Sequence, residues 1–400
     1  MLRLLHTADW HLGQTLRGFS RHTEHQQVLN SLIDLAQQHQ PHAFIIAGDI
    51  FDSPNPSAEA QRLFYKTLVQ IHTASPNTTT IITAGNHDAA SRLEAPRDLL
   101  SAINVHVVGN IRRHIGTTLA AQHLIPILNT NAEPIGHVLA VSYPTAACLP
   151  ASDSLIRSLQ TLYLDLVNQT RPQWQGLPLI LTGHLHVSGS DQSEGAERSI
   201  LIGGENAFPA HLFPPEATYI ALGHLHKPQR AGANHIRYSG SLIPLSASEI
   251  DYTHGVTLVE IDNNQLTTNH LPLPRPLPFL RIPQSGYATY DEVTSLLNNT
   301  TPHDMLQPFA QVRLRRAGLP PTFREDLDTL AESRGLRLVE TRVEDTANPS
   351  NPLTPLPSQT ISDYDPAHFF ELAFKRTTDQ DPTSAHRAVF HQILEQAQPQ

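Results

Sequence analysis

Cysteine, long apolar runs and a leader segment are scarce or absent in this sequence. A single cysteine, Cys148, occurs among 400 residues, which excludes an internal disulfide and a cysteine-type zinc cluster. The segment MLRLLHTADW at the N-terminus lacks the charged-then-apolar pattern of a signal peptide, and no apolar run reaches the roughly 18 residues of a membrane span. We therefore expect a soluble, unexported, cytoplasmic protein without a membrane partner.

Excess positive charge and a phosphate-binding loop are also missing. The net charge of −10 argues against a free-standing, high-affinity DNA binder, because phosphate contacts normally need clustered lysine and arginine. Six of these ten net negative charges come from residues 321–400, so the rest of the chain is less acidic than the total suggests. No Gly-x-x-x-x-Gly-Lys-Ser/Thr occurs, and the chain therefore cannot itself be a phosphate-loop ATPase.

The residues that are plentiful point to a large core and to metal binding. With 39% hydrophobic residues in a chain of 400, we expect one large core with smaller modules attached, because single cores stop growing near about 250–300 residues. The 24 histidines are more than a neutral surface requires, and histidine is the commonest nitrogen ligand of metals in proteins.

Short apolar runs alternate with segments of helical periodicity in the N-terminal part of the chain. Val28, Leu29, Leu32 and Leu35 have helical spacing within residues 23–39, and residues 57–72 repeat the pattern. Strands that alternate with helices predict a layered α/β core. The expected strands are Leu2–Leu5, Ala43–Ala47, Thr79–Thr83, Val138–Ser142, Leu177–Thr182 and Tyr219–Leu222.

The composition changes near residue 272, where the proline-rich run LPLPRPLPFLRIP begins. Proline favours an extended connection there, so we predict a main domain over 1–271, a small α/β capping module over 272–345, a linker over 346–360 and a helical tail over 361–400. The tail either docks on a partner or folds back on the core. The module's expected elements are strands Phe279–Ile282, Phe309–Leu314 and Leu336–Val343 and helices Tyr290–Leu297 and Thr322–Ser333.

Four kinds of short polar motif follow the expected strands. Each motif alone is more often an ordinary strand end or turn, but the ordered set is hard to explain in that way. Ligands normally bind at strand ends in an α/β sheet. The motifs are Asp9-x-His11, Gly48-Asp49-Ile50-Phe51-Asp52, Gly85-Asn86-His87-Asp88 and two Gly-His-Leu-His sequences, at Gly183–His186 and Gly223–His226.

These residue types match the needs of a pair of divalent cations. Two cations about 3.5–4 Å apart need a bridging carboxylate and a mixed oxygen and nitrogen shell. Asp49 directly follows the apolar run AFIIAG and is the natural bridge. Alternation along an extended strand end lets Asp9 and His11 point to the same side, and the same holds for His224 and His226.

The ordered motifs resemble those of the calcineurin-like metallophosphoesterases. Together, HTADWHLG, AGDIFD, TAGNHD, ENAFPAHLFPP, ALGHLHKPQ and YSGSLIPLS resemble the SbcD family of nuclease subunits in particular. The resemblance implies a four-layer β-sandwich flanked by helices, and two divalent metal ions that are usually Mn²⁺, with Mg²⁺ as the alternative. It also implies a homodimer that binds DNA and joins an SbcC-type SMC-like ATPase in a heterotetramer associated with the nucleoid.

The resemblance further implies roles for individual residues. His87 would be the acid that helps expel the leaving oxygen, and Asp88 would orient His87 or its neighbours. Asp52 is a weaker carry-over, and His186 is one histidine more than the family pattern needs. The first metal would be held by Asp9, His11, Asp49 and His226, and the second by Asp49, Asn86, His184 and His224.

The expected function is therefore that of a metal-dependent DNA nuclease subunit in DNA repair and recombination. The resemblance implies a 3′–5′ exonuclease on double strands and an endonuclease on single strands that processes hairpins and ends. Two alternatives stay open at this point. The same metals could serve a phosphatase or phosphodiesterase with a non-DNA substrate, or the chain could be an SbcC-binding scaffold without catalysis.

Overall fold

The computed structural model describes residues 1–111, 120–193, 197, 207–263, 265–300 and 307–344, and part of the C-terminal segment (370, 371, 374, 375, 381–383, 386, 387, 389 and 390). Contacts divide the chain into two compact units, Met1–Glu344 and Asp345–Gln400. No helix within the described residues is long and apolar enough to cross a membrane.

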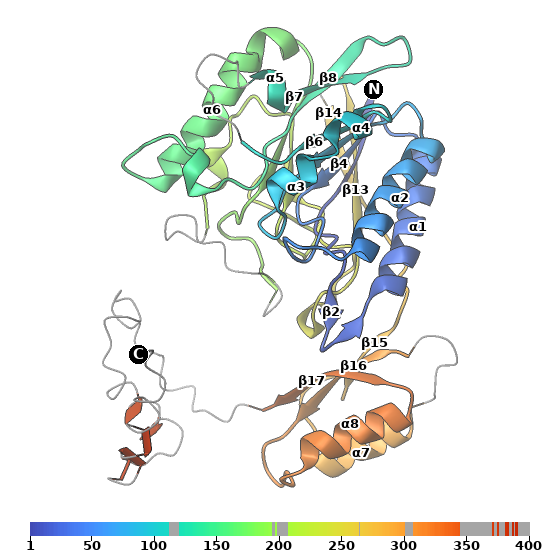
Figure 1. The fold of residues 1–400 in the computed structure, drawn as a ribbon, viewed down its shortest axis with the longest axis vertical. Coiled ribbons are helices and arrows are strands. Elements are labelled where there is room, and N and C mark those ends of the chain that lie inside the picture. The colour runs from blue at the N-terminus through green and yellow to red at the C-terminus, as the bar shows by residue number, and fades with distance from the viewer. Residues whose placement is uncertain are drawn as a thin grey trace. The chain divides into compact units, whose positions relative to one another are not determined.

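Two six-stranded sheets form the main part of the first unit (Figure 1). The first has the order β14-β13-β1-β4-β5-β6, in which β1, β4, β5 and β6 are parallel to one another and β13 is antiparallel to β1. Its strands are β1 (Leu2–Thr7), β4 (Ala43–Ala47), β5 (Thr79–Thr83), β6 (Val105–Val108), β13 (Gly255–Asp262) and β14 (Gln265–Pro272).

The second sheet has the order β11-β12-β10-β9-β8-β7. Strands β8, β9, β10 and β12 are parallel, and Gly223 of β10 lies opposite His184 of β9. Both sheets therefore present several parallel carboxyl ends. The strands are β7 (Leu124–Leu128), β8 (Pro134–Leu139), β9 (Leu179–His184), β10 (Tyr219–Gly223), β11 (Gln229–Arg230) and β12 (Ile236–Tyr238).

Alternating side chains of these strands build three apolar layers. Ile45 of β4 and Ile180 of β9 belong to the core between the sheets, whereas Phe44 packs toward α1 and α2, and Leu181 toward α6. The order helix, sheet, sheet, helix confirms the predicted four-layer fold (Figure 1). The helices of this part are α1 (His22–His39), α2 (Ala58–Ala74), α3 (Ala90–Glu94), α4 (Arg97–Ser101), α5 (Ala120–His123) and α6 (Leu155–Trp174).

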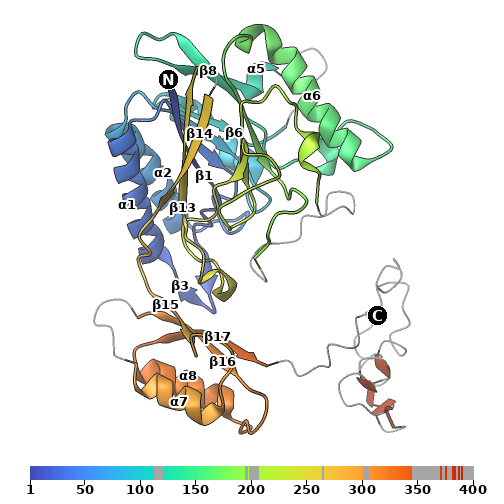
Figure 2. The ribbon, with the colours of Figure 1, turned by 180° about the vertical axis from the view of Figure 1, so that it is seen from behind.

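A smaller three-stranded parallel sheet with two helices completes the first unit (Figure 2). Its β15 (Phe279–Ile282), β16 (Phe309–Leu314), β17 (Arg337–Val343), α7 (Tyr290–Asn298) and α8 (Phe323–Ser333) match the predicted elements closely. Arg17 holds this module through two hydrogen bonds to Asp328, of 2.6 and 2.7 Å. Arg17 lies between the short strands β2 (Thr15–Leu16) and β3 (Phe19–Ser20).

The second unit is described only at scattered residues of the predicted tail. Phe370 stacks on Phe390 with ring centroids 4.4 Å apart, and Arg387 donates to Glu371 over 2.7 Å. Residues from the two predicted helical segments therefore contact each other. The predicted linker over 346–360 lies outside the described residues.

Two predicted strands are displaced from their expected positions. The run expected at Leu177–Thr182 is observed as β9, Leu179–His184, and the second strand is displaced further. The expected run was Val138–Ser142, whereas β8 spans Pro134–Leu139. Pairing with β7 and β9 fixes the observed range. Beyond it, the Val141 N–H donates to the Thr182 hydroxyl instead of continuing the ladder.

Candidate metal centre

The polar residues that follow the parallel strands meet at one edge of the two sheets. Asp9, Asp49 and Asn86 come after β1, β4 and β5, while His184 ends β9 and His224 follows β10. Carboxyl ends of parallel strands are the usual place for a ligand. The structure thus brings together side chains that are far apart along the chain.

Among the described residues, the side chains form three groups with metal-ligand chemistry. One of them is His11, Asp52 and His87, and the other two consist only of predicted metal ligands. In each of these two groups the carboxylate oxygen and imidazole nitrogens lie within 4.8 Å of one another, and every member is buried. Asn86 joins the second group, because its Oδ1 lies 3.0 Å from His184 Nε2. The first group is Asp9, His11 and His226, and the second is Asp49, His184 and His224.

Asp49 belongs to the second group and also approaches His11 of the first. Its Oδ2 is 3.5 Å from His11 Nε2 and 3.3 Å from His184 Nε2. Its other oxygen, Oδ1, accepts a hydrogen bond of 2.8 Å from the backbone N–H of His87. This is the position that a bridging carboxylate requires.

The donor set suits divalent cations. Asp9 Oδ2 and His224 Nε2 are buried and have no hydrogen-bond partner among the described residues, which is costly for a polar atom unless a ligand or ion satisfies it. Oxygen and imidazole donors together suit cations such as Mn²⁺ and Zn²⁺. The residues therefore fit a pair of divalent metal ions.

The backbone at this edge is held in unusual conformations. Asp9, His11, Asp49 and His224 all have positive φ, at 54°, 44°, 50° and 101°, a region that non-glycine residues rarely occupy. Such strain persists where the surrounding structure enforces it and is frequent at functional sites.

Close approach of backbones, rather than conformational freedom, explains the glycine before His224. Gly223 does not have positive φ, but a Cβ at this position would collide with the carbonyl of Ala47 on β4. Glycine here lets β10 approach the first sheet closely. The two metal-ligand groups, which draw on both sheets, depend on that approach.

Burial and neighbouring charges shift the pKa values of the carboxylates and histidines in this site. Burial raises the pKa of Asp9 to about 6. Burial opposes ionisation of Asp49 as well, but His184 and the other nearby histidines hold its pKa well below the ordinary value. Burial would lower the pKa of His184, whereas the negative charge of Asp49 raises it to about 9. Because metal binding needs neutral imidazole, bound cations compete with protons here.

His87 lies beside the first group without belonging to it. Its ring centroid is 4.7 Å from that of His11, and its Nδ1 donates to the backbone carbonyl of Asp52 over 2.8 Å. Asp52 also places Oδ1 at 3.3 Å from His11 Nδ1. The segment around Asp52 therefore contacts both histidines.

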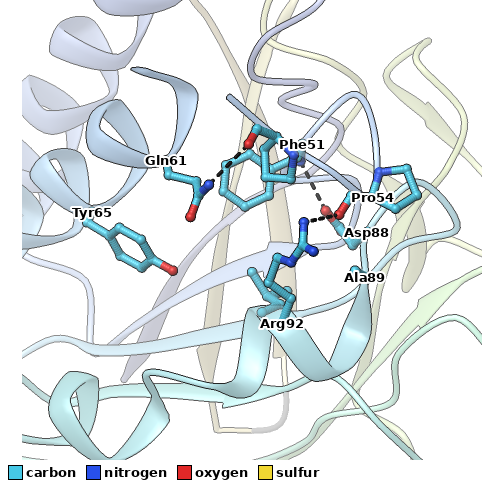
Figure 3. Close-up of a pocket in the computed structure, with 9 residues that line it drawn as sticks. Phe51, Pro54, Gln61, Tyr65, Asp88, Ala89 and Arg92 are labelled. Carbon is cyan, nitrogen blue, oxygen red and sulfur yellow. Dashed lines mark hydrogen bonds between the residues drawn. The ribbon is translucent and has the colours of Figure 1, made fainter. Parts of the chain in front are cut away.

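Asp88 fastens two of the motif loops together. Its carboxylate accepts hydrogen bonds from the backbone N–H groups of Ile50, Phe51 and Gly85, at 3.1, 3.0 and 2.9 Å. Figure 3 shows Asp88 beside Phe51 and Arg92, and the Arg92 guanidinium donates to the carbonyl of Pro54 over 2.8 Å. Asp88 and Arg92 thus hold the loop that carries Asp49 and Asp52.

Sequence reasoning did not single out Glu249, which touches a predicted ligand. This buried carboxylate accepts a hydrogen bond of 2.8 Å from His226 Nδ1. Burial would lower the pKa of His226, but the charge of Glu249 raises it to about 9. Glu249 follows PLSAS in the sequence, and this local sequence does not predict its contact with His226.

Comparisons with known proteins agree with this geometry. The calcineurin-like phosphoesterase family matches residues 2–228. The chain is 39% identical over 387 residues to the D subunit of the SbcCD nuclease of Rhodobacter capsulatus, and the match covers 93% of this chain and 94% of that protein. Identity to the protein of the same name from Escherichia coli K12 is 36% over 295 residues, covering 70% and 71% of the two chains.

The length of the family match and the buried donor groups together define the class of enzyme. The chain is a metal-dependent phosphodiester hydrolase with the calcineurin-like fold. The similarity extends beyond residue 228, since 93% of the chain aligns with the Rhodobacter capsulatus protein. The chain therefore belongs to the SbcD family of SbcCD nuclease subunits within the calcineurin-like phosphoesterases.

Proposed function

We propose that this chain hydrolyses phosphodiester bonds of DNA as the nuclease subunit of an SbcCD-type complex in the cytoplasm. It would act as a 3′–5′ exonuclease on double strands and as an endonuclease on single strands, including hairpins. The observation that carries the proposal is the position of Asp49 Oδ2, 3.5 Å from His11 and 3.3 Å from His184. A bridging carboxylate between two mixed ligand groups is the arrangement that two-metal phosphodiester hydrolysis needs.

The proposed ligands divide between two Mn²⁺ ions, with Mg²⁺ as the alternative. When bound, the ions would polarise the phosphate and lower the pKa of the attacking water. Asp49 would serve both ions. The first ion would be held by Asp9, His11, Asp49 and His226, and the second by Asp49, Asn86, His184 and His224.

His87 is the proposed general acid. Its Nδ1 donates to the Asp52 carbonyl, and in the imidazolium form its Nε2–H would give a proton to the oxygen that leaves when the P–O bond breaks. The remaining proposed role is that of Asp88, which orients the neighbours of His87 through Gly85, Ile50 and Phe51.

Cleavage of end-labelled linear DNA tests the proposal directly. The purified chain, alone and with an SbcC-type ATPase, is incubated with Mn²⁺, Mg²⁺ or a chelator on duplex, hairpin and single-stranded substrates. We expect cleavage that needs Mn²⁺ and removes nucleotides from 3′ ends of duplexes. A matched assay uses bis-p-nitrophenyl phosphate and p-nitrophenyl phosphate.

The matched assay separates the competing functions. Hydrolysis of the small esters with no cleavage of any DNA, with or without the ATPase, would favour a phosphatase or phosphodiesterase with another substrate. A chain that binds the ATPase and Mn²⁺ but hydrolyses nothing would be a scaffold. Either result contradicts the proposed nuclease.

We further propose that residues 272–345 form a capping module and that residues 361–400 dock on the ATPase in a heterotetramer with a homodimer of this chain. Supporting this, Phe370 and Phe374 recur at helical spacing with Phe390 stacked on Phe370, and short isolated helices are marginal without a partner surface. A chain ending at Glu344 should stay dimeric and cleave single-stranded DNA with Mn²⁺, but fail to co-elute with the ATPase. Normal co-elution would contradict the docking proposal.

A further inference from the structure

Glu249 makes a pair of hydrogen bonds that join His226 to a fixed segment of backbone. Its Oε1 accepts from His226 Nδ1 over 2.8 Å, and its Oε2 accepts from the backbone N–H of Leu245 over 2.8 Å. Glu249 is fully buried, and His226 is almost so. Each oxygen of this buried carboxylate therefore accepts one hydrogen bond, and together the two bonds link the His226 ring to the backbone at Leu245.

The hydrogen bond to Nδ1 decides which nitrogen of His226 can bind a metal. A carboxylate acceptor keeps the proton on Nδ1, so the lone pair of the neutral ring lies on Nε2. His226 already groups with Asp9 and His11. Nε2 is then the nitrogen available to complete that group.

We propose that Glu249 is a positioning residue that fixes the tautomer and ring orientation of His226 and thereby sets the affinity of the first metal site. The inference rests on the proposed function, because it takes His226 as a ligand of that site. Carboxylates that orient ligand histidines typically contribute about 10–100-fold to metal affinity.

The corresponding partner in the second group is uncharged. His184 Nδ1 donates to the backbone carbonyl of Ala47 over 2.9 Å. A carbonyl fixes the tautomer equally well, but a full negative charge also makes the imidazole a more basic ligand. The two proposed sites are thus oriented by different chemistry, and a change at residue 249 should act on one of them.

The segment that carries Glu249 is held on several sides. Glu249 ends a 3₁₀ turn, Ala247–Glu249, and Gln14 donates to the carbonyl of Leu245 over 2.8 Å. Ala247 also packs in one apolar cluster with Phe279 and Phe309 of the small α/β module. A rigid attachment of this kind is what orientation of a ligand requires.

Calorimetric titration of the metal-free full-length chain with Mn²⁺ tests the proposal. The parent should bind two ions, whereas Glu249→Gln should weaken one binding step by roughly 10–100-fold and leave the other unchanged. Glutamine keeps the size of the side chain but offers one acceptor where two are needed. The matched control is Glu94→Gln, another buried glutamate, whose carboxylate accepts hydrogen bonds from the backbone of Gly109 and Asn110.

A spectroscopic readout distinguishes positioning from general destabilisation. In the Co²⁺-loaded parent, the Nδ1–H of His226 should give a paramagnetically shifted exchangeable proton signal that His226→Ala removes. Glu249→Gln should shift this signal or speed its exchange with water. Glu249→Asp, which keeps the charge on a shorter side chain, should weaken the same binding step less than glutamine does, and it serves as the readout should the glutamine variant fail to fold.

The outcomes separate this inference from the proposed function. If His226→Ala loses one ion while Glu249→Gln or Glu249→Asp binds both with parental affinity, Glu249 does not position the ligand. If His226→Ala itself binds two ions with parental affinity, His226 is not a ligand, and the proposed metal scheme fails before the role of Glu249 is reached. Weakening by Glu94→Gln equal to that by Glu249→Gln would also overturn the inference.

Discussion

The two Gly-His-Leu-His sequences are identical tetrapeptides on adjacent parallel strands, yet they occupy the site differently. Gly183–His184 ends β9, and Gly223 ends β10, where it lies opposite His184. The leading histidines, His184 and His224, belong to the same group. The trailing histidines have different positions. His226 is buried in the first group, whereas His186 is half-buried and outside both groups.

The neighbours of each tetrapeptide cause this difference. After β9, the Phe208 N–H donates to the carbonyl of His186 over 2.8 Å, and the Tyr238 hydroxyl donates to the carbonyl of Leu185 over 2.7 Å. These bonds direct that segment along the second sheet. After β10, positive φ at His224 turns the chain, and Glu249 holds His226. The four-residue motif therefore places its first histidine in a group, while the surroundings decide whether the second histidine joins one.

Asp49→Ala should have the largest effect, because it should remove metal from both groups. Asp49 is the proposed ligand of both ions, so we expect loss of both Mn²⁺ ions and nuclease activity at background. Metal analysis after gel filtration measures this. Two tightly bound ions in the folded variant would show that the bridging assignment is wrong.

His226→Ala should remove only the first ion. The second group keeps His184 and His224, so about one Mn²⁺ should remain, and the nuclease rate should fall at least about a hundredfold because two-metal catalysis is lost. Calorimetry and a DNA cleavage assay measure the two quantities. Loss of both ions would mean that the groups are not independent.

His87→Ala should separate metal content from turnover. His87 lies beside His11 but outside the proposed ligand scheme, so both ions should stay bound while the rate falls roughly 10²–10⁴-fold, the usual contribution of a positioned general acid. Parallel metal analysis and cleavage kinetics provide the check. Loss of manganese would make His87 a ligand, and an unchanged rate would exclude it from the mechanism.

His6 is a buried histidine outside both tetrapeptides, and it should make the stability of the fold depend on pH. Burial lowers its pKa from 6.5 to about 3, so the unfolded state binds the extra proton first. The stabilisation is fully present above pH 6.5 and is lost as the pH falls toward 3. Between pH 7 and pH 5 the loss should be about 2 kcal/mol.

Urea unfolding of the chelated protein at the two pH values measures this loss. His6→Leu cannot bind the proton, and its stability should therefore fall by about 2 kcal/mol less than that of the parent over the same range. Equal pH dependence in both proteins would mean that His6 is not kept neutral by the fold.

His186→Ala should have the smallest effect and gives the sharpest contrast with His226→Ala. His186 lies outside both groups, and its Nδ1 accepts from Gln192 Nε2 over 3.1 Å. Both Mn²⁺ ions should stay bound, with a nuclease rate within about twofold of the parent. Loss of an ion in this variant would mean that His186 is a metal ligand after all.

Much of the fold is encoded locally, and some is not. The strands Ala43–Ala47, Thr79–Thr83, Phe279–Ile282 and Phe309–Leu314 were predicted with their observed bounds, because buried parallel strands are continuous apolar runs. Helix α6 and the hairpin β13–β14 were not predicted. The exposed strand β14, QLTTNHLP, has few apolar residues, and pairing with β13 is what makes it a strand.

The sequence by itself determined which residues could bind metal, because histidine, aspartate and asparagine directly after apolar strands are readable from local order alone. Tertiary structure decided how they combine. Asp49 of the second group also approaches His11 of the first, His186 lies outside both groups, and Glu249 is brought to His226 from 23 residues away. The physical reason is that ligation depends on distance and orientation in space, which the packing of two sheets sets and which no single segment contains.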